Sequence, residues 1–312
     1  MSTRTLAVGL ALFTLAPAAR AADPAPPAEP CATGEVLTLD LAALAAEFAA
    51  RPWPPGDVHP LDDERLSPSA APDYAPLLAR LGLSELAATV RPAPDRTLGE
   101  VYTCALSTTP AQLDAGRPAD TLARVDCTTP GTPGLGDGAA TSIVRVLRPL
   151  GDGRFCALGQ IGFSGFESSA PCLYRRPEGT PTLHLELQPL VAKDRMAIRE
   201  TFYGGTCGSG ILRGDDVHLR FHGVEGGRLV TYFDAVLSRG DYESPCPPES
   251  MEAGSVVLSG GFPKRIRYVL KTECADVEAG PDCRYSGACK PTESDTRWVF
   301  SDGRYQIAPP KP

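Results

Sequence analysis

The stretch TSIVRVLRPLGDGRFCALGQI, residues 141–161, decides the fold class. Apolar residues alternate with other residues on both sides of a central Gly151-Asp152-Gly153, and a period of two is typical of β-strands. Asp-Gly supplies the positive φ angles that a two-residue hairpin turn requires. The stretch therefore predicts two antiparallel strands joined by a tight turn.

The same period of two recurs after residue 96, with turn residues between the segments. A second Asp-Gly turn is expected at Ser301-Asp302-Gly303. Because helix-length segments are lacking between the strands, parallel crossovers are not supported, and the sequence predicts antiparallel sheets in a sandwich- or barrel-like arrangement. Further strands are expected at 101–106, 121–127, 182–190, 195–203, 216–224, 227–237, 264–274, 296–300 and 303–307.

Helices are expected only before this β-rich part. Asp40 can cap a helix that runs through Leu41–Phe48, because its carboxylate can accept from a backbone N–H of the first turn. After a proline-rich loop, Asp73 precedes a shorter apolar segment with Leu77–Leu81. The fold class is therefore mainly β, with an α+β character at the N-terminus.

The first residues have the features of a secretory signal peptide. Arg4 is followed by the apolar run Leu6–Leu15 and by Ala19-Arg20-Ala21, which fits a cleavage site. The run is about half of the roughly 20 apolar residues that a membrane helix needs, and no later segment approaches that length, so a transmembrane segment is not expected. The expected organisation is a signal peptide at 1–21, an Ala/Pro-rich tether at 22–34, a helical segment at 35–95 and an antiparallel β domain at 96–312.

The chain has 10 cysteines, an even number that favours disulfides in an exported protein. Proximity in sequence suggests that Cys156 pairs with Cys172, and that two of Cys274, Cys283 and Cys289 pair with each other. A zinc site in the latter cluster is disfavoured, because its spacing lacks the C-x-x-C pair of structural zinc sites. The disulfides indicate the periplasm or the extracellular medium as the final location.

Acidic residues outnumber basic ones, 38 to 30, for a formal net charge of −8. Removal of the signal peptide would take away Arg4 and Arg20 and make the mature chain more acidic still. Nucleic acids and anionic membrane surfaces require clustered cations, so they are disfavoured as partners. The expected partner is a protein or a small-molecule ligand, and the oligomeric state stays open.

The segment DVHLRFHGV, residues 216–224, carries the candidate ligand-binding residues His218, Arg220 and His222. In a strand these three side chains share one face, opposite the apolar ones. The two histidines would stand roughly 13 Å apart, whereas nitrogens that share a zinc ion each lie about 2 Å from it, so a metal site is not expected. The alternatives are a ligand-binding face, for example for an anion, and an ordinary solvated face.

A second polar face is expected in KRIRYVLK, residues 264–271. Ile266 alternates with Arg265 and Arg267, and Lys271 follows on the same outward side. Such a face could receive a carboxylate or a phosphate. The alternatives are a solvated face and one that protects a sheet edge from pairing with another chain.

No enzyme motif is complete in this chain. GFSGF, residues 162–166, has phenylalanine where a hydrolase elbow needs its last glycine, and the phosphate-binding loop, the dinucleotide fingerprint and H-E-x-x-H are all missing. No catalytic residue and no cofactor is therefore assigned. The sequence favours a binding or envelope-associated structural module; the alternative is a secreted hydrolase whose carboxylates are dispersed over different strands.

Overall fold

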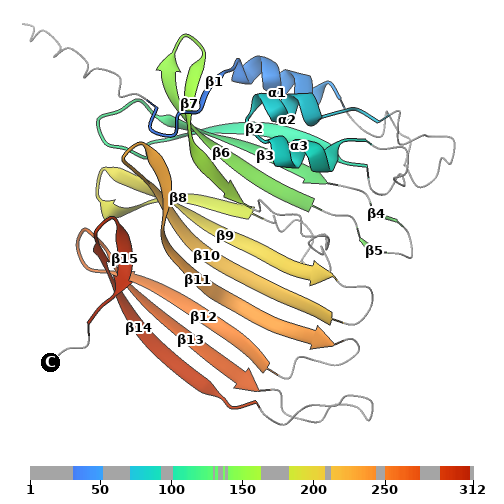
Figure 1. Cartoon of the computed structure of the whole chain (residues 1–312). Coiled ribbons are helices and arrows are strands. Elements are labelled where there is room, and N and C mark those ends of the chain that lie inside the picture. Colours follow the sequence, from blue (N-terminus) through green and yellow to red (C-terminus); the bar gives the residue numbers. More distant parts are fainter. Residues whose placement is uncertain are drawn as a thin grey trace, which may run out of the picture.

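A computed structural model describes residues 31–51, 71–92, 101–128, 131–132, 136–137, 140–162, 183–207, 212–243, 250–274 and 289–309. It confirms a mainly β protein with two large antiparallel sheets and three short helices near the N-terminus (Figure 1). The helices are α1 (Leu41–Ala49), α2 (Ala75–Arg80) and α3 (Ser84–Val90). The predicted signal peptide lies outside the described residues, and so does most of the predicted tether.

A five-stranded sheet has the strand order β1-β7-β6-β3-β2. The predicted hairpin is confirmed, because β6 and β7 pair across a turn in which Asp152 has a φ of 53°. Its strands are β1 (Val36–Thr38), β2 (Thr103–Ala111), β3 (Asp120–Thr128), β6 (Ala140–Gly151) and β7 (Arg154–Gly162), and a small ribbon consists of β4 (Gly131–Thr132) and β5 (Gly136–Asp137).

An eight-stranded sheet follows in which each strand lies beside its neighbour in sequence. The second predicted turn is confirmed between the last two strands, where Asp302 has a φ of 52°. The strands are β8 (Leu183–Ala192), β9 (Arg195–Cys207), β10 (Leu212–Glu225), β11 (Arg228–Glu243), β12 (Ser250–Ser259), β13 (Arg265–Cys274), β14 (Thr292–Ser301) and β15 (Arg304–Ile307).

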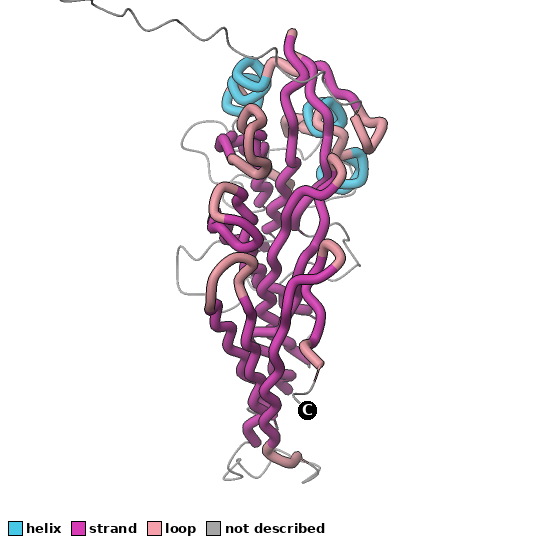
Figure 2. Tube along the Cα trace, turned by 90° about the vertical axis from the view of Figure 1, so that its left-hand side faces the viewer, coloured by secondary structure: helices cyan, strands magenta, loops and turns pink. Residues whose placement is uncertain are grey.

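The helices cover one face of the five-stranded sheet, at one end of an elongated molecule (Figure 2). The predicted first helix is confirmed: Asp40 accepts a hydrogen bond from the backbone N–H of Ala43 at 2.9 Å. Leu44 and Phe48 are four residues apart and therefore share one helix face, which is fully buried. No helix in the described part of the chain is long and apolar enough to cross a membrane.

The opposite face of the five-stranded sheet packs on the eight-stranded sheet. Along β6, Ile143 and Leu147 belong to the helix side, whereas Val144 and Val146 belong to a second core with residues of β8, β9 and β10. At the contact between β7 and β11, a Cβ on Gly159 would lie 2.7 Å from the Cβ of Leu229. Glycine is therefore required for this close approach of the two sheets.

The eight-stranded sheet is divided at the joint between β11 and β12. These two strands share only three paired positions, Ser238–Gly240 against Met251–Ala253. A third core, rich in aromatic rings, lies between residues of β10–β11 and residues of β13–β15. Phe233 is central to it, with its ring centroid 5.3 Å from that of Trp298 and 6.4 Å from those of Tyr268 and Tyr305.

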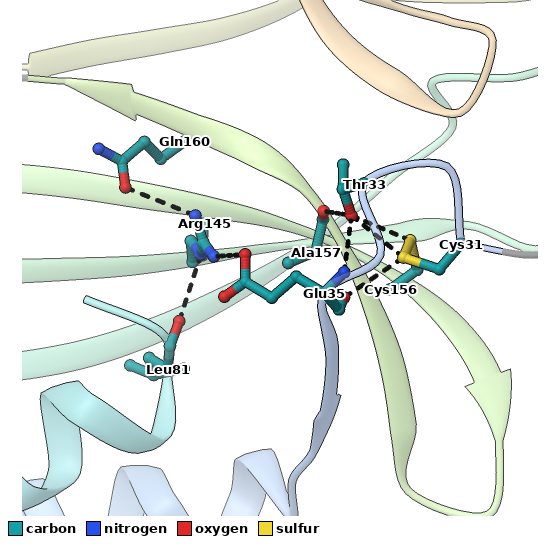
Figure 3. Close-up of polar contacts among 8 residues, drawn as sticks. All are labelled: Cys31, Thr33, Glu35, Leu81, Arg145, Cys156, Ala157 and Gln160. Atoms are coloured by element: carbon teal, nitrogen blue, oxygen red, sulfur yellow. Dashed lines mark hydrogen bonds and ion pairs between the residues drawn. A yellow bond between two sulfur atoms is a disulfide. The ribbon is translucent and has the colours of Figure 1, made fainter. Parts of the chain in front are cut away.

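A disulfide anchors the N-terminal segment to the five-stranded sheet (Figure 3). The predicted pair of Cys156 with Cys172 is wrong, because Cys156 is bonded to Cys31. The physical reason is that β1 pairs with β7 in a register that sets Val36 opposite Cys156, which brings the segment before β1 close to that cysteine. Cys172 lies outside the described residues.

An ion pair of a buried arginine strengthens the same anchor. Arg145 of β6 contacts the carboxylate of Glu35 and also donates from Nε to the carbonyl of Leu81, at 3.2 Å, so that it joins the N-terminal segment to the loop after α2 (Figure 3). Arg145 is almost fully buried. Its charge is therefore compensated where water cannot solvate it.

Two further disulfides link neighbouring strands or the segments next to them. Cys104 and Cys127 lie directly opposite each other on β2 and β3. Cys274 pairs with Cys289, which confirms the prediction that two members of the C-terminal cluster pair with each other. The cluster therefore has a structural role at the end of β13.

Candidate functional site

The candidate residues His218, Arg220 and His222 lie on β10, inside the eight-stranded sheet. The register of β10 with β9 is continuous along this stretch, so the three side chains share one face. The same register sets Glu200 of β9 and Asp234 of β11 on either side of Arg220. We call these five residues the β10 polar network.

The inner end of the network is a buried pair. Nε2 of His222 lies 2.6 Å from Oε2 of Glu200, and the two residues are 5% and 1% exposed. If Nε2 donates to the carboxylate, Nδ1 of the neutral ring accepts from the hydroxyl of Thr231, which lies 3.2 Å away. The other oxygen of Glu200, Oε1, is buried and has no hydrogen-bond partner.

The outer end of the network faces solvent. Arg220 donates from Nε to Oδ2 of Asp234 at 3.0 Å, and its Nη1 lies 4.0 Å from Oε2 of Glu200. Nδ1 of His218 lies 3.5 Å from Oδ1 of Asp234, an electrostatic contact without hydrogen-bond geometry. The exposed fraction of the side chains rises from 1% at Glu200 to 33% at Arg220 and 47% at Asp234.

Electrostatics hold the exposed carboxylate in its charged form. Partial burial alone would raise the pKa of Asp234, but the contact with His218 and the charge of Arg220 outweigh burial, so the pKa lies below its usual range. Asp234 therefore places a negative charge beside Arg220. This carboxylate offsets the charge of Arg220, so the exposed end is not the purely cationic face that the β10 sequence alone suggested, which disfavours a simple anion as its ligand.

Glu200 and Asp234 were missed by reasoning from the sequence, because each lies in a separate strand without any motif around it. Only the strand register could have found them. In the described part of the chain, no group of three or more His, Cys, Asp or Glu side chains is arranged to hold a metal ion.

The second predicted face, on β13, is rearranged by its neighbours. Lys271 contacts Glu293 of β14 at 3.5 Å, and Arg267 forms a bidentate pair with Asp295. Arg265 keeps its outward position, and Arg297 of β14 lies directly opposite Arg267. Lys271 is thus ion-paired with Glu293, whereas Arg297 joins Arg265 and Arg267 as a third arginine on this face.

Comparisons of the chain with protein-family models, curated proteins and solved structures found no match. Function is therefore argued from the residues of this chain alone.

Proposed function

We propose that this disulfide-stabilised antiparallel β protein is an exported binding or envelope-associated structural module, and that the β10 polar network is its ligand-binding face. The observation that carries the proposal is the joining of His218, Arg220 and His222 by two carboxylates from the flanking strands. Three disulfides support an oxidising compartment.

The buried and exposed ends of the network have different roles in this proposal. Glu200 and His222 are held by packing and by their short contact, so they fix the position of Arg220 at the sheet surface. Arg220 and Asp234 are the parts that a ligand can reach. Pre-positioned side chains lower the entropic cost of binding, because fewer rotamers are lost when the ligand arrives.

The chemistry of the exposed end selects a ligand class. Arg220 donates its Nε–H to Asp234, so its other guanidinium N–H groups are available to an acceptor on the ligand. The carboxylate of Asp234 accepts further hydrogen bonds next to it. A neutral group that presents an acceptor beside a donor, such as an amide of a peptide or of a small molecule, satisfies both partners without adding net charge.

The alternative, a hydrolase with dispersed carboxylates, gains less support from this network. Such an enzyme needs one carboxyl group with a raised pKa to donate a proton beside one that stays ionised. The pKa of Asp234 is lowered, and Arg220 lies between the two carboxylates where a substrate bond would have to fit. The binding role therefore accounts better for the arrangement.

The test is a titration of protein labelled with ¹³C at the histidine rings, which number four. N-acetyl amino-acid amides serve as probes, since each carries adjacent donors and acceptors. We expect at least one probe to shift the ring signals of His218 and His222 in a saturable manner. The ring of His184, which contacts Glu186 on the opposite face, should not move.

Arg220→Ala should abolish the shifts. Arg199→Ala is the matched control, because Arg199 lies on the opposite face of β9 and pairs with Glu186. The proposal fails if no probe shifts His218 or His222, if His184 moves equally, or if the two arginine variants behave alike.

A further inference from the structure

A groove of about 970 Å³ lies between β13, β14 and the segment that follows β15. The residues that matter for its chemistry are Arg265 and Arg267 from β13 and Asp295, Arg297 and Val299 from β14. All of them lie outside the β10 polar network. The groove is within the size range of small-molecule sites.

Arginines dominate the charge of this groove. Arg267 and Arg297 are directly opposite each other on neighbouring strands, and like charges in that position destabilise a sheet. Asp295 forms hydrogen bonds of 2.8 to 3.1 Å with Arg267. Hydrogen bonding from Arg267 also holds the pKa of Asp295 below its usual range. The charge of Arg297 lowers this pKa as well, so two guanidinium groups share one carboxylate.

Arg265 and Arg297 form no ion pair with any residue in the described part of the chain, although both are exposed and line the groove. The three arginines and one carboxylate that line the groove in the described part of the chain therefore sum to a charge of +2, in a chain whose net charge is −8. A local excess of positive charge on a negatively charged protein attracts anions to that site and not to the rest of the surface.

We propose that this groove binds a small organic anion with two carboxylate or phosphate groups. Guanidinium groups match both oxyanions in a bidentate geometry, and one group of the ligand is available for each of Arg265 and Arg297. The binding of an anion also removes the repulsion between Arg267 and Arg297. Val299, two residues after Arg297 and therefore on the same face of β14, lines the groove beside the arginines and supplies apolar surface for the carbon skeleton between the charged groups.

The test uses isothermal titration calorimetry of the intact protein at constant ionic strength. Citrate and succinate serve as carboxylate probes, pyrophosphate and inorganic phosphate as phosphate probes, and chloride as the control. We expect saturable binding of citrate or pyrophosphate that chloride does not reproduce. Whichever of these two probes binds more tightly shows whether the groove prefers carboxylate or phosphate groups. Succinate, which carries two carboxylates, should also bind saturably, whereas inorganic phosphate, which carries one group, should bind more weakly.

Arg265→Ala and Arg297→Ala should each weaken binding about tenfold or more, because a hydrogen bond to a charged group contributes roughly 1.5–3 kcal/mol. Arg304→Ala is the matched control: Arg304 is an exposed arginine of β15 that does not line the groove. Arg220→Ala should also leave binding unchanged, so this result is independent of the function proposed for the β10 polar network.

Fluorescence of Trp298 gives a second readout. The chain has two tryptophans, so Trp53→Phe leaves Trp298 as the reporter. The proposal is overturned if no probe binds saturably, if chloride gives the same response, or if Arg304→Ala weakens binding as much as Arg297→Ala. It is also overturned if Arg297→Ala causes only self-association, since the arginines would then serve to protect the sheet edge.

Discussion

The five-stranded sheet and the outer part of the eight-stranded sheet are built from similar strands but differ in how their faces are covered. In β6, Val144 and Leu147 face opposite sides, and both are fully buried. In β12 no side chain is fully buried, and Val257 is 52% exposed. The difference teaches that stability is concentrated in the first region, whereas the second offers surface for contacts.

The largest expected contrast concerns ion pairs. Arg148 and Asp120 form a buried bidentate pair, with hydrogen bonds of 2.8 and 3.1 Å, and burial raises the pKa of Asp120 even though Arg148 opposes the shift. Arg148→Met should therefore destabilise the fold by about 3–5 kcal/mol, because it leaves a buried carboxylate unpaired. Arg267→Met breaks the exposed pair with Asp295 and should destabilise the fold far less, because solvent screens exposed ion pairs. Urea unfolding measures both values.

The next contrast concerns apolar side chains. Leu147→Ala should cost about 2–5 kcal/mol, since Leu147 is fully buried between the sheet and the helices. Val257→Ala should change the free energy of unfolding by no more than about 0.5 kcal/mol. If the two substitutions had equal effects in urea unfolding, the comparison between the regions would be wrong.

The disulfides extend the comparison to chain connectivity. Cys31 and Cys156 are 125 residues apart, whereas Cys274 and Cys289 are 15 apart. A longer closed loop restricts the unfolded chain more, so replacing the first pair by alanines should cost about 2 kcal/mol more than replacing the second. Thermal unfolding of the two double variants under non-reducing conditions measures the difference. A larger loss for the C-terminal pair would contradict the entropic argument.

The smallest expected effect is a sensitivity of the aromatic core to alkaline pH. Burial raises the pKa values of Tyr232 and Tyr305, so the folded state keeps both phenols neutral. Below about pH 10 both tyrosines are neutral in the folded and the unfolded chain, so the free energy of unfolding does not depend on their ionisation. Above about pH 10 they ionise in the unfolded chain only. This lowers the free energy of unfolding by about 1 kcal/mol or less per tyrosine at pH 10.5.

Tyr305→Phe should flatten this alkaline slope in urea unfolding measured from pH 8.5 to 10.5. Tyr74→Phe provides the comparison in the helix-covered region, because burial raises the pKa of Tyr74 as well. An unchanged slope in Tyr305→Phe would show that other groups govern alkaline unfolding.

Much of the fold follows from the sequence because its signals are local. Asp-Gly turns and alternation with period two depend on adjacent residues, which is why both hairpins and the helix cap at Asp40 were predicted. The strand β12 was missed, since SMEAGSVVLS mixes small, polar and apolar residues on both faces. A strand whose two faces are both partly exposed lacks the alternation on which such a prediction rests.

Features that depend on strand order could not be predicted. Proximity in sequence favoured Cys172 as the partner of Cys156, but the pairing of β1 with β7 brought Cys31 there instead. The same limit applies to the β10 polar network. Its β10 members were identified because they alternate in one segment, whereas Glu200 and Asp234 join them only through hydrogen bonding between strands.

The position of β1 beside β7 has a consequence for the order in which the chain can assemble. Ribosomes deliver the N-terminus first, yet β1 cannot pair until residues of β7 have followed. During that interval Cys104 and Cys127 become available to Cys31 before its native partner Cys156 does. Any disulfide that Cys31 forms during that interval is therefore non-native, and thiol–disulfide exchange is needed to release it. Efficient maturation thus favours an oxidant that acts late, or an isomerase that corrects what an early oxidant has joined.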